Sequence, residues 1–176
     1  HHVIAGNYRL GEFQGAVLNG QLDRFEDQAR TRDANGQYLA SRVAAVPGLH
    51  PQARHADCTR HGYHLFMLRL DPGAFGAPRG AVTEALAAEG IPCSSGYGFS
   101  LPRQPLFRNK AFGPYLAGAS ARLDYESVRC PASDLLCEQC IWLDHAMLLG
   151  SRADIDDIAR AFEKIYEHRA ELARLR

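Results

Sequence analysis

Apolar residues recur at helical spacing from about residue 11 to residue 46, and this long pattern limits the fold more than any other feature. The stripe consists of Phe13, Ala16, Val17, Gly20, Phe25, Ala29, Tyr38, Leu39, Val43 and Val46. Charged residues fill the opposite face, and Pro47-Gly48 ends the pattern. Because a single helix of this length is unusual in a globular domain, we predict a bend or break near residues 33–36.

The chain of 176 residues is long enough for one domain with its own hydrophobic core. Its 20 basic and 20 acidic residues cancel, so no overall field favours nucleic acid. No apolar run approaches the roughly 20 residues of a membrane span. We therefore expect neither nucleic acid nor a membrane as a partner. The five cysteines are an odd number and the start shows no signal-peptide pattern, which favours reduced thiols in a cytoplasmic protein.

Strands and helices alternate after the long helix. We expect a polar loop over residues 48–61, a strand over 63–70 (YHLFMLRL), a helix over 79–89 and a second strand over 91–95. Residues 96–129 are rich in proline, glycine and aromatic residues and are predicted to form a long loop. An irregular segment of this length is usually functional or mobile, so this loop could line a cleft.

The carboxy-terminal part is predicted to hold a helix over residues 132–140, short strands at 141–143 and 147–149, and a helix that Ser151 caps. The buried stripe of that last helix is Ile155, Ile158, Ala159, Phe162, Ile165 and Tyr166. Residues 167–176 continue it as a charged end. This order of elements predicts the α/β class, with a small antiparallel or mixed sheet covered by helices.

The most specific stretches are Gly6–Leu10 (GNYRL), Glu12–Gln14 (EFQ), Tyr63–Phe66 (YHLF) and Glu89–Pro92 (EGIP). In these stretches the chain resembles the DegT/DnrJ/StrS family of sugar aminotransferases, which use pyridoxal phosphate (PLP) and have fold type I. In that family an N-Y-R segment opens the long helix that joins the large domain to the small one. The resemblance covers most of the chain.

The resemblance implies a division of the chain into two parts. Residues 1–46 would be the end of the large-domain segment and the interdomain helix, and residues 47–176 would be the C-terminal small domain. Leu101–Phe107 (LPRQPLF), Leu123–Tyr125 (LDY) and Trp142-Leu143 resemble the branch that aminates keto-inositols such as scyllo-inosose for aminocyclitol antibiotics. They also resemble, less strongly, the relatives that make aminohydroxybenzoate.

Asn7 and Arg9 are the first candidate site residues. Asn7 is a neutral donor at a helix start, where free N–H groups favour an anion such as phosphate. The planar fork of Arg9 suits a carboxylate or an oxygen-rich substrate. From spacing alone, an ordinary helix cap and a surface arginine are the favoured explanation of the pair. The resemblance implies that Asn7 reaches the PLP phosphate of the neighbouring subunit in a homodimer, and that Arg9 binds the amino donor or substrate.

Further candidates for substrate binding are His64 at the start of a strand and Tyr97 between two glycines. Arg108, with Arg103 and Asn109 in the same loop, could bind substrate hydroxyl groups. The simpler alternative for His64 is a satisfied histidine at a sheet edge. For Tyr97 it is an aromatic side chain packed in its loop.

Two groups of residues have spacings that suggest metal ligands. They are His55, Cys58, His61 and His64, and the set Cys130, Cys137 and Cys140. Structural zinc needs four converging ligands, whereas the first group runs from a loop into a strand. The second group lies on an apolar helix face, where free cysteines pack as small hydrophobic residues. We therefore expect no metal.

The only lysines are Lys110 and Lys164, and neither has the sequence context of the family's PLP-binding lysine, which lies upstream of N-Y-R. We therefore expect no catalytic residue in this chain. The resemblance implies that the parent enzyme moves an amino group from glutamine or glutamate to a keto-cyclitol or keto-sugar. Three alternatives stay open: a nucleotide-sugar aminotransferase, a stand-alone α/β binding module, and a zinc-binding protein.

Overall fold

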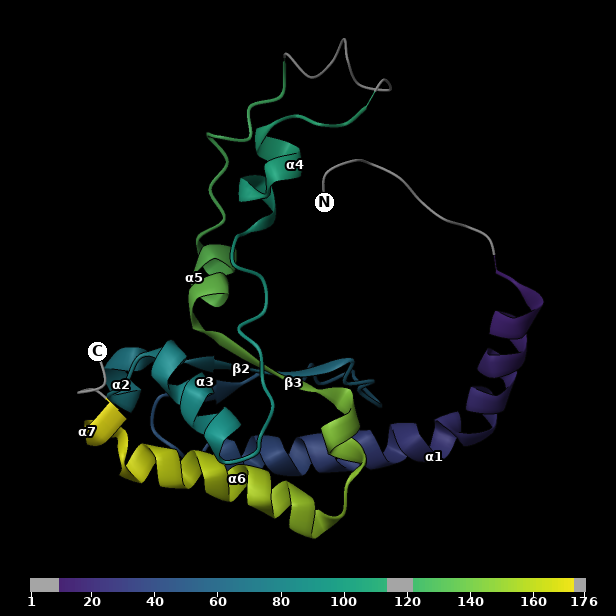
Figure 1. Cartoon of the computed structure of the whole chain (residues 1–176), viewed down its shortest axis with the longest axis vertical. Coiled ribbons are helices and arrows are strands. Elements are labelled where there is room, and N and C mark those ends of the chain that lie inside the picture. The colour runs from purple at the N-terminus through teal and green to yellow at the C-terminus, as the bar shows by residue number, and fades with distance from the viewer. Residues whose placement is uncertain (1–9, 114–121, 173–176) are drawn as a thin grey trace.

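A three-stranded antiparallel sheet in the order β1-β2-β3 forms the centre of the computed structural model, which describes residues 10–113 and 122–172 (Figure 1). The strands are β1 (Leu49–Pro51), β2 (Leu65–Leu70) and β3 (Cys140–Asp144). The predicted α/β class is confirmed, and both strand pairs are antiparallel. The central strand β2 is the strand that the apolar run YHLFMLRL predicted.

Two strand predictions need correction. Strand β1 lies where we expected only a polar loop, because Leu49 is buried opposite Leu70 and pairs with it before the polar residues begin. The strand predicted over residues 91–95 is reduced to one bridge between Ser94 and Trp142. A proline within that segment has no N–H group to donate to a ladder of hydrogen bonds.

Helices cover one face of the sheet, and side chains along β2 and β3 alternate accordingly. The fully buried side chains on the covered face are Phe66, Leu68, Leu70, Ile141 and Leu143. The opposite, open face carries the half-buried Met67, Arg69, Cys140 and Trp142. A sheet with one face this accessible has room for a further layer.

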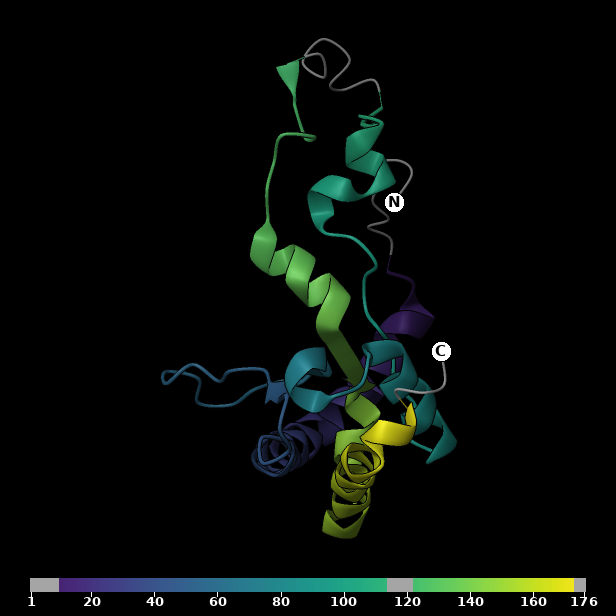
Figure 2. The ribbon, with the colours of Figure 1, turned by 90° about the vertical axis from the view of Figure 1, so that its left-hand side faces the viewer.

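The long helices α1 (Glu12–Val43) and α6 (Arg152–Glu167) pack against each other along the covered face (Figures 1 and 2). A capping box between Ser151 and Asp154 starts α6, which confirms Ser151 as the predicted cap. Its apolar stripe is buried, from Ile155 through Ile158, Ala159 and Phe162 to Ile165. Arg42 of α1 forms ion pairs with two carboxylates of α6, at 2.6 and 2.8 Å.

Helix α1 is continuous through residues 33–36, so the break predicted there is wrong. Asn35 and Gly36 are buried, and the Asn35 amide donates hydrogen bonds to the carbonyl oxygens of Leu148 and Gly150, both at 2.9 Å. These contacts with another part of the chain hold the backbone helical despite the glycine. Figure 1 shows that α1 changes direction earlier, in its purple amino-terminal half.

The other helices of the body are shorter. They are α2 (Pro72–Phe75), α3 (Arg79–Ala88) and α7 (Arg169–Leu172). Helix α3 confirms the predicted helix, whereas the charged end predicted to continue α6 is interrupted after Glu167, and α7 follows as a separate turn. Among the described residues, no helix is both long and apolar enough to cross a membrane.

Residues 147–149, predicted as a strand, belong instead to the 3-10 helix η4 (His145–Leu149). The Asp144 side chain accepts a hydrogen bond from the Ala146 amide at 2.8 Å and starts this turn. Leu148 is fully buried in the turn. The apolar run therefore comes from one core contact on a helical turn, a pattern too short for its periodicity to separate from a strand.

An arm, defined as residues 96–113 and 122–139, rises away from the sheet and its helices (Figures 1 and 2). It contains η1 (Leu101–Arg103), α4 (Pro105–Arg108) and α5 (Pro131–Gln139). Helix α5 was predicted, whereas η1 and α4 interrupt what we expected to be an irregular loop over residues 96–129. Prolines in the first turns of all three helices set the backbone angle that starts them.

Candidate functional site

The predicted site residues lie in different places. Asn7 and Arg9 fall outside the described residues, so their roles stay predictions. His64 stands just before β2 at one end of the sheet, Tyr97 lies at the base of the arm, and Arg108 ends α4. A different set of local contacts fixes each of these three positions.

An ion pair joins the segment before His64 to helix α1. Both terminal nitrogens of Arg54 bind the Asp33 carboxylate, and the same guanidinium donates to the Cys58 carbonyl at 2.9 and 3.2 Å. The amide of His61 also donates to Asp33, at 3.2 Å. Burial acts to raise the pKa of Asp33, but the hydrogen bonds from Arg54 and His61 outweigh it and hold the pKa below its usual value.

A close contact with α1 sets the direction in which the chain enters β2. Tyr63 is buried and has a positive φ of 44°, and its ring lies 2.5 Å from where a Cβ on Gly36 would stand. Only glycine at position 36 leaves room for this ring. The next residue, His64, is exposed, and its ring centroid lies 6.4 Å from that of His145. Two imidazoles that can donate or accept hydrogen bonds thus meet at this end of the sheet.

Tyr97 is placed against Trp142 by a glycine turn. Gly96 has a φ of 68°, and a Cβ there would lie 2.5 Å from the Trp142 ring. The ring of Tyr97 then meets Trp142 edge-on, with 5.4 Å between the ring centroids. Tyr97 is 66% exposed, so its phenol is available beside the open face of the sheet.

Arg79 anchors both ends of the arm. Its Nη1 donates to the carbonyl oxygens of Ser95 (3.2 Å), Cys137 (2.8 Å) and Cys140 (3.3 Å). Ser95 immediately precedes the outgoing limb of the arm (residues 96–113). Cys137 lies near the end of the returning limb (residues 122–139), and Cys140 directly follows that limb. One guanidinium therefore ties the outgoing limb to the returning limb through charge-assisted hydrogen bonds. No sequence pattern predicted this role, because all three acceptors belong to the backbone.

Three aromatic rings hold the outer part of the arm together. Phe107 and Phe112 come from the outgoing limb and Tyr125 from the returning limb, with centroid separations of 5.1, 5.7 and 5.9 Å. All three pairs are edge-to-face, a geometry that aromatic quadrupoles favour. The two limbs consequently keep a defined spacing.

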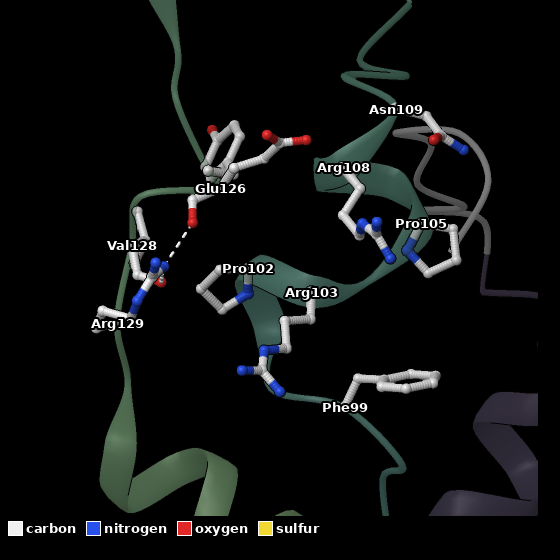
Figure 3. Close-up of a pocket in the computed structure, with 10 residues that line it drawn as sticks. Phe99, Pro102, Arg103, Pro105, Arg108, Asn109, Glu126, Val128 and Arg129 are labelled. Atoms are coloured by element: carbon white, nitrogen blue, oxygen red, sulfur yellow. Dashed lines mark hydrogen bonds between the residues drawn. The ribbon is translucent and has the colours of Figure 1, made fainter.

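A pocket of about 950 Å³ opens between these limbs. Figure 3 shows Arg103 and Arg108 of the outgoing limb across the pocket from Glu126 and Arg129 of the returning limb, with Asn109 on the side of α4 away from the returning limb. The structure thus brings together the three loop residues that the sequence singled out. It adds Glu126 and Arg129, which sequence reasoning missed because they belong to the other limb.

The structure does not gather His64, Tyr97 and Arg108 into one site. Helix α4, which carries Arg108, stands away from the sheet in Figures 1 and 2, whereas His64 and Tyr97 both border strands. Within the described residues, these side chains lie in three places: His64 at the end of the sheet, Tyr97 beside its open face, and Arg108 in the arm pocket.

Comparison with known proteins places the chain. Residues 1–163 match the DegT/DnrJ/EryC1/StrS aminotransferase family. The chain belongs to this family. It is 35% identical over 175 residues to the L-glutamine:2-deoxy-scyllo-inosose aminotransferase of Streptomyces fradiae, a match that covers 97% of this chain and 41% of that protein. It is 28% identical over 169 residues to the 3-amino-5-hydroxybenzoate synthase of Amycolatopsis mediterranei (strain S699), covering 92% of this chain and 42% of the synthase.

The fold matches as well. The crystal structure of 3-amino-5-hydroxybenzoic acid synthase superposes with a TM-score of 0.73 at 27% identity, covering 94% of this chain and 41% of that one. The predicted resemblance, including its scyllo-inosose branch, is therefore confirmed. This chain spans about two fifths of the length of the DegT/DnrJ/EryC1/StrS relatives it matches.

The two lysines do not stand in a PLP site. Lys164 lies on the surface of α6, where its ammonium binds the Glu89 carboxylate at 2.7 and 3.0 Å. Lys110 is exposed on the arm, with a positive φ of 51°. Lys110 also lines a small arm pocket together with Phe107, Asp124 and Tyr125. Neither lysine has the sequence context of the family's PLP-binding lysine, so neither is assigned to PLP.

The cysteines and histidines form no metal centre in the described residues, where no three His, Cys, Asp or Glu side chains converge. All five cysteines are free thiols. Burial raises the pKa of the Cys140 thiol and of the Cys93 thiol, which disfavours the reactive thiolate. Of these cysteines, Cys93 packs against the hydrophobic core.

Proposed function

We propose that the complete protein is a PLP-dependent aminotransferase that moves an amino group from glutamine or glutamate to the ketone of a cyclitol or sugar, in aminocyclitol antibiotic biosynthesis. The observation that carries this proposal is the 35% identity to an L-glutamine:2-deoxy-scyllo-inosose aminotransferase, which extends over 97% of the chain. When bound, PLP would supply the electron sink for this chemistry. The proposal assigns the lysine that binds PLP to a part of the complete protein other than Lys110 and Lys164.

The domain boundary is part of the proposal. Residues 1–46 provide the end of the large-domain segment and the interdomain helix, and residues 47–176 form the C-terminal small domain. The amino-terminal half of α1 supports this division, because large apolar side chains on it are exposed. They are Phe13, Val17, Leu18, Leu22 and Phe25, and the exposed Leu10 lies just before the helix. An exposed apolar stripe of this extent is typical of a surface that another layer of polypeptide covers.

Each predicted site residue has a place in this scheme. Asn7 binds the PLP phosphate of the neighbouring subunit in a homodimer, and Arg9 binds the carboxylate of the amino donor or the acceptor. His64 and Tyr97, which border the sheet, contact the hydroxyl groups of the acceptor. Arg108 contacts substrate from the arm. No residue of this chain is assigned a catalytic role.

The protein would act in the cytoplasm on small molecules, with no nucleic acid and no membrane as partner. The runner-up is a nucleotide-sugar aminotransferase, which differs only in its acceptor. A stand-alone binding module without transamination is the alternative of another class. One set of assays separates the three.

The assay uses the protein expressed from its complete reading frame, with PLP and L-glutamine, and detects the amine product by chromatography. We expect turnover of 2-deoxy-scyllo-inosose and none by residues 1–176 alone. Turnover of a nucleotide-linked ketosugar only would favour the runner-up. Ligand binding without PLP and without turnover would favour the module. Borohydride-stable attachment of PLP to Lys110 or Lys164 in the 176-residue chain would overturn the assignment of the lysine to another segment.

Two variants test the substrate residues within the active enzyme. Tyr97→Phe and His64→Leu each remove a hydrogen-bonding group, so KM for the acceptor should rise about tenfold. The matched control is His55→Leu, because the His55 side chain is 80% exposed on the loop before β2. An unchanged KM in both variants, with the control behaving alike, would remove His64 and Tyr97 from the substrate site.

A further inference from the structure

The arm pocket has a composition that the aminotransferase proposal alone does not explain. Three guanidinium groups, those of Arg103, Arg108 and Arg129, line it together with a single carboxylate, that of Glu126 (Figure 3). Its volume of about 950 Å³ lies at the upper end of the range found for small-molecule sites. The lining therefore combines an excess of positive charge with room for a ligand.

The three guanidinium groups differ in how many hydrogen-bond or ion-pair partners they already have. Arg129 donates to the carbonyl oxygens of Glu126, at 2.5 Å, and of Val128, at 3.3 Å. The Nε of Arg103 lies 3.6 Å from the Asp134 carboxylate, with the Arg103 side chain 61% exposed. No ion pair within residues 10–113 and 122–172 involves Arg108. Of the three arginines, Arg108 therefore has the fewest partners within these residues.

Asp134 acts as a positioning residue for Arg103, which lines the pocket. Its carboxylate accepts a hydrogen bond from the Ser100 hydroxyl at 2.5 Å, and Ser100 is buried. The carboxylate is thereby fixed next to Arg103 and limits where that guanidinium can point. Preorganised guanidinium groups lose less freedom when a ligand binds.

The remaining wall is apolar and comes from Phe99, Pro102, Pro105 and Val128, with the ring of Tyr125. Such a wall favours the carbon skeleton of a ring over a free inorganic ion. A guanidinium binds phosphate and carboxylate oxygens in the same bidentate geometry. A compact molecule that carries one such group beside a ring would match both the charged and the apolar parts of the pocket.

We propose that the arm pocket binds the phosphate or carboxylate group of a small ring-bearing molecule, through Arg108 and Arg103 with Arg129 beside them. The proposal rests on the proposed function in treating Arg108 as a substrate-binding residue, and it adds that the group recognised is an anion. A substrate or effector of the enzyme would then carry a negative charge, in contrast to an uncharged keto-cyclitol.

The test measures binding rather than turnover, so it can succeed even if the transamination assay fails. The protein from the complete reading frame is titrated with inorganic phosphate, myo-inositol 1-phosphate, benzoate, L-glutamate and uncharged myo-inositol. Calorimetry gives the affinities, and the Nε–H resonances of the arginines report the site. We expect saturable binding of myo-inositol 1-phosphate or benzoate and none of myo-inositol. If only the phosphate-bearing probes bind, the ligand of the pocket carries a phosphate group. If only the carboxylates bind, the ligand is a carboxylic acid.

The variants Arg108→Gln and Arg103→Gln should each weaken that binding by about tenfold, since each removes charge-assisted hydrogen bonds. The matched control is Arg160→Gln, an exposed arginine of α6 outside the pocket, which should bind as the wild type does. The proposal is overturned if no charged probe saturates, or if Arg108→Gln and Arg160→Gln behave alike. Binding of an acidic protein surface in place of every small anion would also overturn it and make the arm an interface.

Discussion

The body, defined as residues 29–95 and 140–172, and the arm are built on different principles. Large side chains in the body are fully buried, including Phe66, Phe75, Leu86 and Phe162. In the described part of the arm, by contrast, the only buried residues are Ser100, Leu106 and Phe112. The arm also exposes large apolar residues, which are Tyr97, Phe99, Leu101, Val128, Leu135 and Leu136.

This difference separates stability from binding. Burial of apolar area is the main favourable contribution to folding, so most of the stability resides in the body. The arm depends on a few aromatic contacts and on Arg79 at its base. Segments with few buried contacts open most readily, and binding regions are commonly of this kind. The arm therefore has the properties of a binding element, and the well-packed body supports it.

The largest expected contrast compares one phenylalanine from each region. Phe66→Ala should lower the free energy of unfolding by about 3–5 kcal/mol, because it leaves a cavity in the core behind the sheet. Phe99→Ala removes a ring that is 59% exposed, so the free energy of unfolding should change by less than about 0.5 kcal/mol. Urea denaturation followed by circular dichroism measures both. Similar losses in the two variants would show that the arm shares the core's stability.

A smaller effect is expected at the junction of the two regions. Arg79→Met keeps much of the side-chain volume but removes three hydrogen bonds to carbonyl oxygens, so the base of the arm should loosen by about 2 kcal/mol. Hydrogen exchange should accelerate in η1, α4 and α5 while α6 keeps its protection. Arg160→Met, which removes an exposed arginine of α6, is the control. Faster exchange throughout α6 would mean that Arg79 supports the body instead.

Glycine substitutions in α1 sharpen the comparison within one helix. Gly36→Ala places a methyl group 2.5 Å from the Tyr63 ring and should cost about 1–2 kcal/mol despite the better helix propensity of alanine. At Gly20 nothing lies within 4 Å, so Gly20→Ala should stabilise by about 0.5–1 kcal/mol. Thermal unfolding of the two variants gives the direction of each change in stability. Stabilisation by both substitutions would mean that the Tyr63 ring moves aside without cost.

The sequence predicted those elements whose signals are local. Strand β2 and helix α6 follow from apolar periodicity, and the Ser151 cap with Asp154 marks the start of α6. The family followed from short motifs around Asn7 and Tyr63. These features depend on residues a few positions apart, which is the range over which pattern reasoning is informative.

Features that depend on distant partners could not be predicted in this way. Helix α1 passes through Gly36 because Asn35 binds carbonyl oxygens more than a hundred residues away. Arg79 finds its acceptors at both ends of the arm, and Arg129 reaches the pocket only because the limbs run side by side. A sequence window contains the donors in these cases but not the acceptors, so the contacts become visible only in three dimensions.

The smallest expected effect concerns the loop before β2, which the Asp33–Arg54 ion pair joins to α1 of the body. The pKa of Asp33 is held below its usual value in the folded state, so its ionised form stabilises the fold. This contribution is complete above the unfolded-state value near pH 4 and is lost as the pH falls through the lower folded-state pKa. Asp33→Asn should therefore cost about 1 kcal/mol at neutral pH, and the difference from wild type should shrink below about pH 4.

The control for this prediction is Asp57→Asn, because the Asp57 side chain is 92% exposed. Its unfolding free energy should parallel that of the wild type at every pH, since an exposed pair contributes little. Urea unfolding between about pH 3 and pH 7 gives the two difference curves. If Asp33→Asn also ran parallel to the wild type, the ionised pair would contribute nothing. The loop that carries His64 would then resemble the arm, held in place by few contacts, and its histidine would lose the fixed position that the proposed role requires.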